Sequence, residues 1–189
     1  GDCDVWKLVT DASDLKAGDQ IVIAASNTDY ALSTTQQTNN RTGTSITKTG
    51  NTLEINSFVQ ILTLEEGSEA GTFAFKDTDG TNNGYLYAAS SSSNQLKTKN
   101  SLDDNGSWTI AIASNGVATI KAQGTNTRNT MQYNNSNTLF ACYTSASQSP
   151  VCIYKYVECT TEPTVFVIPK CGGDGGGTWL VVIEWFATF

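Results

Sequence analysis

Short runs of apolar and β-branched residues, separated by polar turns, recur along the whole chain. Apolar and polar residues alternate within many of these runs, as in residues 85–90 and 117–122, and no stretch keeps a 3.6-residue period. Such alternation is typical of half-buried β-strands. Asp79-Gly80, Asn105-Gly106 and Asn115-Gly116 separate some of the runs, and these residue pairs accept the positive φ angles of tight hairpin turns. The pattern predicts an all-β protein.

The predicted strands fall into three sets of four, which begin near Gln20, Thr72 and Val117. The sets comprise residues 20–26, 30–35, 52–55 (or 45–49) and 58–65; residues 72–77, 85–90, 95–99 and 107–113; and residues 117–122, 130–134, 139–144 and 151–157. Three four-stranded repeats are what a β-trefoil requires, since six strands close a barrel and three hairpins cap it. A two-sheet β-sandwich is the alternative, because the same alternation and turn spacing would produce it. Residues 4–10 form one strand too many for the trefoil, and we expect them to extend the barrel beside residues 151–157.

The composition changes after Cys159. Residues 160–163 are typical of a linker, and apolar runs at 164–170 and 178–189 flank a glycine-rich stretch. We therefore predict a β-trefoil-like domain over residues 1–159 and a linker with an apolar C-terminal β-hairpin over 160–189. An isolated apolar hairpin is marginally stable and adhesive. We expect it to dock on the domain or on a second copy, giving a homo-oligomer through 164–189; it could also begin a following domain or be foreign to the natural protein.

The chain is acidic and rich in small polar residues. It holds 27 threonines, 17 serines and 16 asparagines, and 11 basic against 18 acidic residues give a net charge of −7. A chain of this charge repels phosphate-rich partners on average, so we expect no nucleic-acid binding. The longest apolar run, residues 179–183, is far too short to cross a bilayer, so we expect no membrane insertion.

The chain contains no histidine, which excludes Ser-His-Asp and Cys-His catalysis and every histidine-containing metal site. The evident carboxylates, such as Asp103-Asp104 and Glu65-Glu66, fall in predicted turns, where water keeps them ionised. Residues 77–82 alternate oxygen ligands, but the position of Gly80 departs from the EF-hand pattern and a hairpin turn is the simpler interpretation. We therefore predict a non-enzyme without a cofactor or a metal ion.

The five cysteines form no CxxC pair. Cys142 and Cys152 lie on successive predicted strands, where they could form a disulfide or pack as two small buried hydrophobic residues. Antiparallel pairing of the first and last strands of the domain would bring Cys3 close to Cys159. The same register sets Lys7 opposite Lys155, which is unfavourable.

Two resemblances extend the prediction. Residues 84–110, with a Gly-x-Leu-x-Ala strand before the strand of Trp108, are similar to the repeat of fascin-like and growth-factor-like β-trefoils. The Gln-x-Trp signature of ricin-type lectins is absent, so no sugar-site residues carry over from them. More broadly, residues 8–26, 85–98 and 117–134 resemble uncharacterised modules of secreted and surface proteins from gut anaerobic bacteria. This resemblance covers residues 5–157; it implies export to the cell surface or medium and a modular parent protein, and it brings no catalytic residues.

Sugar recognition needs an exposed aromatic platform with amides or carboxylates around it. Tyr85 and Tyr87 share one face of their predicted strand, and Arg128, Gln132 and Tyr133 could line a shallow polar pocket, although core packing or a surface turn is the alternative in each case. The candidate binding residues are Tyr85, Tyr87, Asn94, Arg128, Gln132 and Tyr133. We expect Trp108 and Phe140 to pack in the core.

These features predict a non-catalytic binding module for carbohydrate or another polar surface ligand. The alternative is a structural or adhesion domain that binds a surface protein through its apolar segment, residues 164–189.

Overall fold

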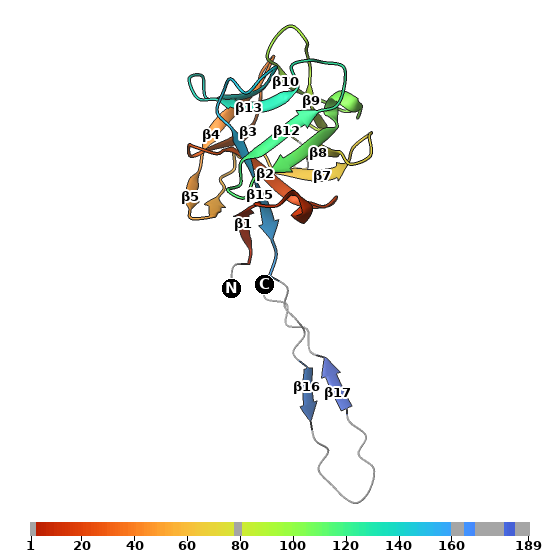
Figure 1. The fold of residues 1–189 in the computed structure, drawn as a ribbon. Coiled ribbons are helices and arrows are strands. Elements are labelled where there is room, and N and C mark those ends of the chain that lie inside the picture. The colour runs from red at the N-terminus through yellow and green to blue at the C-terminus, as the bar shows by residue number, and fades with distance from the viewer. Residues whose placement is uncertain (1–2, 78–80, 160–164, 169–179, 184–189) are drawn as a thin grey trace, which may run out of the picture. The chain divides into compact units, whose positions relative to one another are not determined.

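The computed structural model describes residues 3–77, 81–159, 165–168 and 180–183, and divides the chain into two compact units, Gly1–Val157 and Glu158–Phe189. The first unit consists of strands joined by turns and two single-turn 3₁₀ helices, η1 (Ala12–Asp14) and η2 (Asp104–Gly106) (Figure 1). Its strands are β1 (Val5–Leu8), β2 (Gln20–Ala25), β3 (Tyr30–Gln36), β4 (Arg41–Ser45), β5 (Thr47–Thr49), β6 (Thr52–Glu54), β7 (Leu62–Glu66), β8 (Phe73–Asp77), β9 (Tyr85–Ala88), β10 (Leu96–Lys99), β11 (Trp108–Ile112), β12 (Ala118–Ala122), β13 (Thr130–Asn134), β14 (Leu139–Tyr143) and β15 (Val151–Val157). The prediction of an all-β protein is confirmed.

Six antiparallel pairings close a barrel. β2 pairs with β7, β7 with β8, β8 with β11, β11 with β12, β12 with β15, and β15 with β2. The barrel is uneven, because β8–β11 and β12–β15 each rest on one residue pair, Phe73 with Trp108 and Ala118 with Val151. These are the first and fourth strands of each predicted repeat. The β-trefoil-like fold is therefore confirmed and the β-sandwich alternative is wrong.

Three hairpins, β3–β4, β9–β10 and β13–β14, supply the second and third strands of the repeats. In the first repeat the third strand is Arg41–Ser45, not residues 52–55 or 45–49 as the sequence predicts. Alternation missed this strand because it holds Gly43 and no large apolar side chain, and its most buried residue is Arg41.

Strand β1 extends the sheet beside β15, as predicted, with Val5 opposite Val157 and Lys7 opposite Lys155. The like-charge pair is tolerated because the Lys155 ammonium lies 3.5 Å from the Asp19 carboxylate and donates to the Asp14 carbonyl at 2.7 Å. The other edge of β1 pairs with β6 of the β5–β6 hairpin.

The β1, β5 and β6 strands cover a second, smaller hydrophobic core. Along β2, Ile21 and Ile23 join the main core, whereas Val22 and Ala24 join the second core with Trp6. Alternate residues of β2 therefore point into two different cores, which is why this strand is apolar on both faces. The main core includes Trp108 and Phe140, both fully buried as predicted.

One buried cation joins the first and second repeats. The Arg41 guanidinium is fully buried and donates to Gln36 Oε1 (2.9 Å), the Ser33 carbonyl (3.0 Å), Gln60 Oε1 (2.8 Å) and Thr98 Oγ1 (2.8 Å). The buried Gln60 amide in turn donates to the Asp77 carboxylate at 3.1 Å. Because Thr98 belongs to β10, this network anchors the β9–β10 hairpin to the first repeat.

The four cysteines within the described residues divide into two pairs. Cys142 and Cys152 are buried free thiols, so the disulfide proposed between them is wrong and they pack as small hydrophobic residues. Burial raises the pKa of both thiols because a thiolate is poorly solvated there. Cys3 and Cys159 are both disulfide-bonded, and continuing the β1–β15 register by two residues sets them opposite each other.

The second unit contains one antiparallel strand pair, β16 (Val165–Ile168) with β17 (Leu180–Ile183). We predicted that this hairpin docks through residues 164–189, but their side chains lie outside the described part of the chain. Within the described residues, no helix is long and apolar enough to cross a membrane.

Candidate ligand-binding face

Strand β9 presents two tyrosines on one face. Tyr85 and Tyr87 are half-buried, whereas Leu86 and Ala88 between and beyond them point into the main core. Gly84 comes directly before β9, and a Cβ atom there would lie 2.2 Å from the Lys99 carbonyl oxygen. Glycine therefore allows β10 to lie close against the start of β9, which brings lysine side chains of β10 beside the two rings.

Tyr85 lies in a polar cluster with residues of β7 and β8. Its hydroxyl donates to Glu65 Oε2 at 2.7 Å, and the Lys76 ammonium lies 3.5 Å from Glu65 Oε1 and 5.5 Å from the Tyr85 ring centroid. The negative charge of Glu65 raises the pKa of Lys76. The hydrogen bond to Glu65 raises the pKa of Tyr85, because only the neutral hydroxyl can donate it. At neutral pH the cluster therefore holds one ammonium group, one neutral phenol and a carboxylate that accepts from it.

Tyr87 has a similar environment built from β10 and the turn after it. The Lys99 ammonium lies 4.3 Å from the Tyr87 ring centroid and forms an ion pair with the Asp103 carboxylate. Lys97 lies directly opposite Tyr87 in the β9–β10 ladder, so the two side chains leave the sheet on the same side. We call the set Glu65, Lys76, Tyr85, Tyr87, Lys97, Lys99 and Asp103 the tyrosine face.

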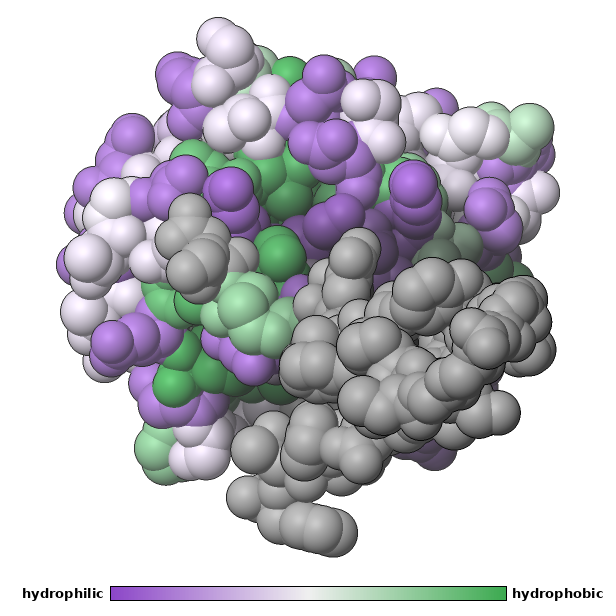
Figure 2. All heavy atoms as spheres, turned by 90° about the horizontal axis from the view of Figure 1, so that it is seen from below, coloured by the Kyte–Doolittle hydropathy of each residue, from purple (hydrophilic) through white to green (hydrophobic). Residues whose placement is uncertain are grey.

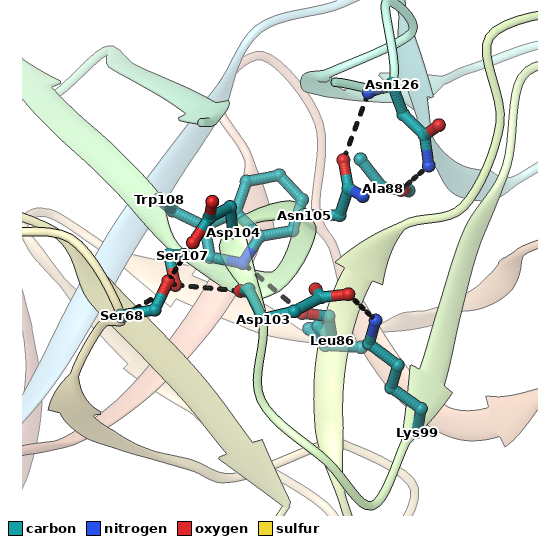
Figure 3. Close-up of polar contacts among 10 residues, drawn as sticks. All are labelled: Ser68, Leu86, Ala88, Lys99, Asp103, Asp104, Asn105, Ser107, Trp108 and Asn126. Atoms are coloured by element: carbon teal, nitrogen blue, oxygen red, sulfur yellow. Dashed lines mark hydrogen bonds and ion pairs between the residues drawn. The ribbon is translucent and has the colours of Figure 1, made fainter. Parts of the chain in front are cut away.

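The acidic turn at η2 holds Asp103 in place (Figure 3). Asp104 accepts from Ser68 Oγ at 2.5 Å, and Ser107 Oγ donates to the Asp103 carbonyl at 2.9 Å. Asn105 Oδ1 accepts from the Asn126 amide at 3.1 Å. The predicted turn is thus present, and its two carboxylates bind different partners, Lys99 and Ser68.

The structure brings Asn94 and Arg128 together. They lie on two loops, one after β9 and one before β13, and Arg128 Nη1 donates to Asn94 Oδ1 at 2.8 Å. The Arg128 amide also donates to the Ser90 carbonyl at 3.3 Å. This pair lies beyond the Ala88 end of β9, adjacent to the hairpin that carries Tyr85 and Tyr87.

The predicted polar pocket of Arg128, Gln132 and Tyr133 is not formed. Tyr133 is fully buried, stacked on Tyr30 at 5.9 Å between ring centroids, because its strand turns it into the main core. The Gln132 side chain is buried under residues 145–148, donating to the Ser145 carbonyl (2.9 Å) and accepting from the Gln148 amide (2.8 Å). Both side chains therefore have structural roles that the strand pattern alone could not distinguish from ligand contacts.

The sequence pattern does not reveal the charged members of the tyrosine face. It places Glu65 in a solvated turn and gives no local sign that Lys76, Lys97 and Lys99 lie beside the tyrosines. Two of these lysines lie directly opposite the tyrosines on neighbouring strands, Lys76 opposite Tyr85 and Lys97 opposite Tyr87. This pairing can be recognised only when the strand registers are known.

Two cavities lie elsewhere in the first unit. One, of about 330 Å³, is lined mainly by β12, β13 and the loop before β15. The other, of about 280 Å³, is lined by charged residues (Lys7, Asp14 and Lys155) and by apolar residues (Leu8, Val9 and Val157). Figure 2 views the molecule from the β1 end, where hydrophobic residues show between hydrophilic ones on the visible face.

The calcium interpretation of residues 77–82 gains no support. The Asp77 carboxylate accepts from the backbone amides of Asn82 (2.5 Å) and Asn83 (3.1 Å), as in a turn, and residues 78–80 lie outside the described part. Among the residues that the structure describes, no three acidic or cysteine side chains are grouped to hold a metal ion.

No known protein family and no curated protein matches the chain in sequence. Solved structures do share its fold. A GH43 β-1,3-galactosidase aligns with a TM-score of 0.55 and 15% identity over 82% of this chain and 31% of its own. ThreeFoil, a designed three-fold symmetric protein, aligns with a TM-score of 0.53 and 14% identity over 74% of this chain and 99% of its own. Lysenin in complex with phosphocholine aligns with a TM-score of 0.51 and 14% identity over 84% of this chain and 49% of its own.

These likenesses establish the three-fold β-trefoil-like fold and nothing finer, because the identities are low. The chain spans about a third of the galactosidase and about half of the lysenin chain.

Proposed function

We propose that the chain is a non-catalytic, exported module that binds carbohydrate through its tyrosine face. The observation that carries the proposal is the pair of half-exposed rings, Tyr85 and Tyr87, side by side on β9 with charged groups around both. Residues two apart on a strand are separated by about 7 Å, so the two rings suit neighbouring rings of an oligosaccharide.

The charged groups suit a ligand rich in hydroxyl groups. A lysine ammonium has three donors, and the ion pairs of Lys76 with Glu65 and Lys99 with Asp103 leave donors available. Each of the two carboxylates likewise retains lone pairs that can accept from a sugar hydroxyl. The face therefore combines apolar rings with donors and acceptors, which is the composition of a sugar site.

Two further points support a binding role rather than catalysis. Glu65 and Asp103 are both ion-paired to lysine, an arrangement that suits hydrogen bonding better than general acid catalysis. The galactosidase likeness covers only part of that enzyme, which fits a fold that serves as one module of a longer protein.

The disulfide-bonded state of Cys3 and Cys159 supports export, because disulfides persist mainly in oxidising compartments. The sequence resemblance to secreted modules points the same way. The alternative, protein adhesion through residues 164–189, concerns residues whose side chains lie outside the described part of the chain.

The test is a glycan-array screen of the full chain, followed by calorimetry with the best ligand. We expect Tyr87→Ala to weaken binding at least ten-fold. Phe58→Ala is the matched control, because Phe58 is the large hydrophobic residue exposed elsewhere on the domain, at 65%. Sugar binding that is unchanged in Tyr87→Ala, or lost equally in Phe58→Ala, would contradict the tyrosine face as the site.

A further inference from the structure

The tyrosine face carries a local excess of positive charge on an acidic protein. Its lysines, Lys76, Lys97 and Lys99, outnumber its carboxylates, Glu65 and Asp103, whereas the whole chain has a net charge of −7. A positive patch on a negatively charged molecule attracts anions locally.

Lys97 is the source of the excess. Lys76 is paired with Glu65 and Lys99 with Asp103, but within the described ranges no carboxylate or carbonyl oxygen accepts from the Lys97 ammonium. Lys97 is half-buried. A lysine at such a position generally packs its stem along the sheet and keeps its ammonium in water.

The register of β10 places Lys97 beside the residue whose ring would stack on a bound sugar. Directly opposed residues of an antiparallel pair have Cβ atoms about 5 Å apart, and the four-carbon stem of Lys97 can extend along the Tyr87 ring. A ligand stacked on Tyr87 therefore comes within reach of an ammonium group that has no hydrogen-bond or ion-pair partner among the described residues.

We infer that the module prefers acidic sugars, and that Lys97 binds the carboxylate or sulfate group of the ligand. The inference rests on the proposed sugar-binding function and specifies its ligand class. Lysine acts on anions as a point charge and does not select between carboxylate and sulfate.

The test compares three disaccharides of the same linkage by calorimetry with the full chain: neutral galactobiose, digalacturonate and sulfated galactobiose. We expect the wild type to bind the two acidic sugars about five-fold more tightly than the neutral one, which is the upper end of what an accessible ion pair contributes. Lys97→Gln removes this preference, so that the variant binds the three sugars with similar affinity, and Lys97→Glu makes the preference negative.

Two control variants distinguish a direct contact between Lys97 and the ligand from the effect of the protein's net charge. Lys121 on β12 is exposed, and Lys7 lines the 280 Å³ cavity, so Lys121→Gln and Lys7→Gln change the net charge by the same amount. Both are expected to keep the preference. The preference should also fall as the sodium chloride concentration rises towards 1 M, where the Debye length is about 3 Å.

The outcomes are distinct. Equal binding of all three sugars, still sensitive to Tyr87→Ala, would overturn the acidic preference and leave the proposed function standing. A preference that survives Lys97→Gln, or that falls equally in Lys121→Gln or Lys7→Gln, would overturn the role of Lys97. If the wild type binds none of the three sugars and no glycan on the array, both the proposed function and the acidic preference are overturned.

Discussion

Replacing Arg41 tests whether its buried network stabilises the fold. Arg41→Met keeps an unbranched apolar stem but removes the guanidinium, so the change in unfolding free energy reports the loss of this charged group and its hydrogen bonds. Gln36 Oε1 also accepts from Thr98 Oγ1 at 2.9 Å, a hydrogen bond that does not involve Arg41 and that we expect the variant to keep. The Ser33 carbonyl and Gln60 Oε1 lose their short contacts of 3.0 and 2.8 Å; Gln60 Oε1 keeps a 3.4 Å contact from Asn82.

Two buried acceptors without a good donor cost about 1–3 kcal/mol each. We therefore expect Arg41→Met to lower the unfolding free energy by about 3 kcal/mol, and the melting temperature by roughly 6–12 °C for a domain of this size. Guanidinium denaturation with linear extrapolation measures the free energy. Hydrogen exchange should also show weaker protection of β10, because the Arg41 bond to Thr98 anchors that strand.

Arg128→Met is the matched control, because Arg128 is half-buried and its guanidinium has one hydrogen bond to a side chain, from Nη1 to Asn94, in the described region. It should cost no more than about 1 kcal/mol. If Arg41→Met costs no more than this control, or stabilises the protein, the desolvation of the guanidinium offsets its hydrogen bonds and our reasoning is refuted.

Two further predictions concern buried titratable groups. Burial raises the pKa of Tyr154 to about 12, whereas an unfolded tyrosine ionises near pH 10. The folded state therefore holds the Tyr154 proton more tightly than the unfolded state does. The resulting contribution to the unfolding free energy is complete below pH 10 and is lost as the pH rises through 12, by about 1.4 kcal/mol per pKa unit. Denaturation between pH 7 and 12 measures this loss of unfolding free energy. An unfolding free energy that stays constant above pH 10 would contradict the raised pKa of Tyr154. The Cys142 and Cys152 thiols should resist iodoacetamide at pH 8 until the protein unfolds, as peptide mapping can show; rapid labelling of the native protein would mean that the β14–β15 region opens readily.

The candidate site was only partly predictable. Period-two alternation placed Tyr85 and Tyr87 on one face of β9, because the direction of a side chain along a strand is a local property. The same rule could not separate Tyr133 from Tyr87: both lie on half-polar strands, but the loop over β13 and the neighbouring Tyr30 enclose one, while the other stays accessible.

The fold, like the site, was only partly predictable from the sequence. The extra strand, residues 4–10, was correctly placed beside residues 151–157, even to the register of Lys7 with Lys155, because both strands are strongly apolar. Strand β4 was missed, since it is held by the hydrogen bonds of buried Arg41 rather than by apolar alternation.

The all-β class, the three-fold repeat and the faces of individual strands can be predicted from the sequence, since these depend on residues that are near one another in the chain. The contacts between lysines and tyrosines, the burial of Arg41 and the ion pairs of the carboxylates depend on the folded structure. Those contacts form between strands whose register depends on the closure of the whole barrel, and Tyr85 meets Glu65 across 20 residues of chain. The charge that completes the tyrosine face is therefore a property of the folded domain and of no single segment.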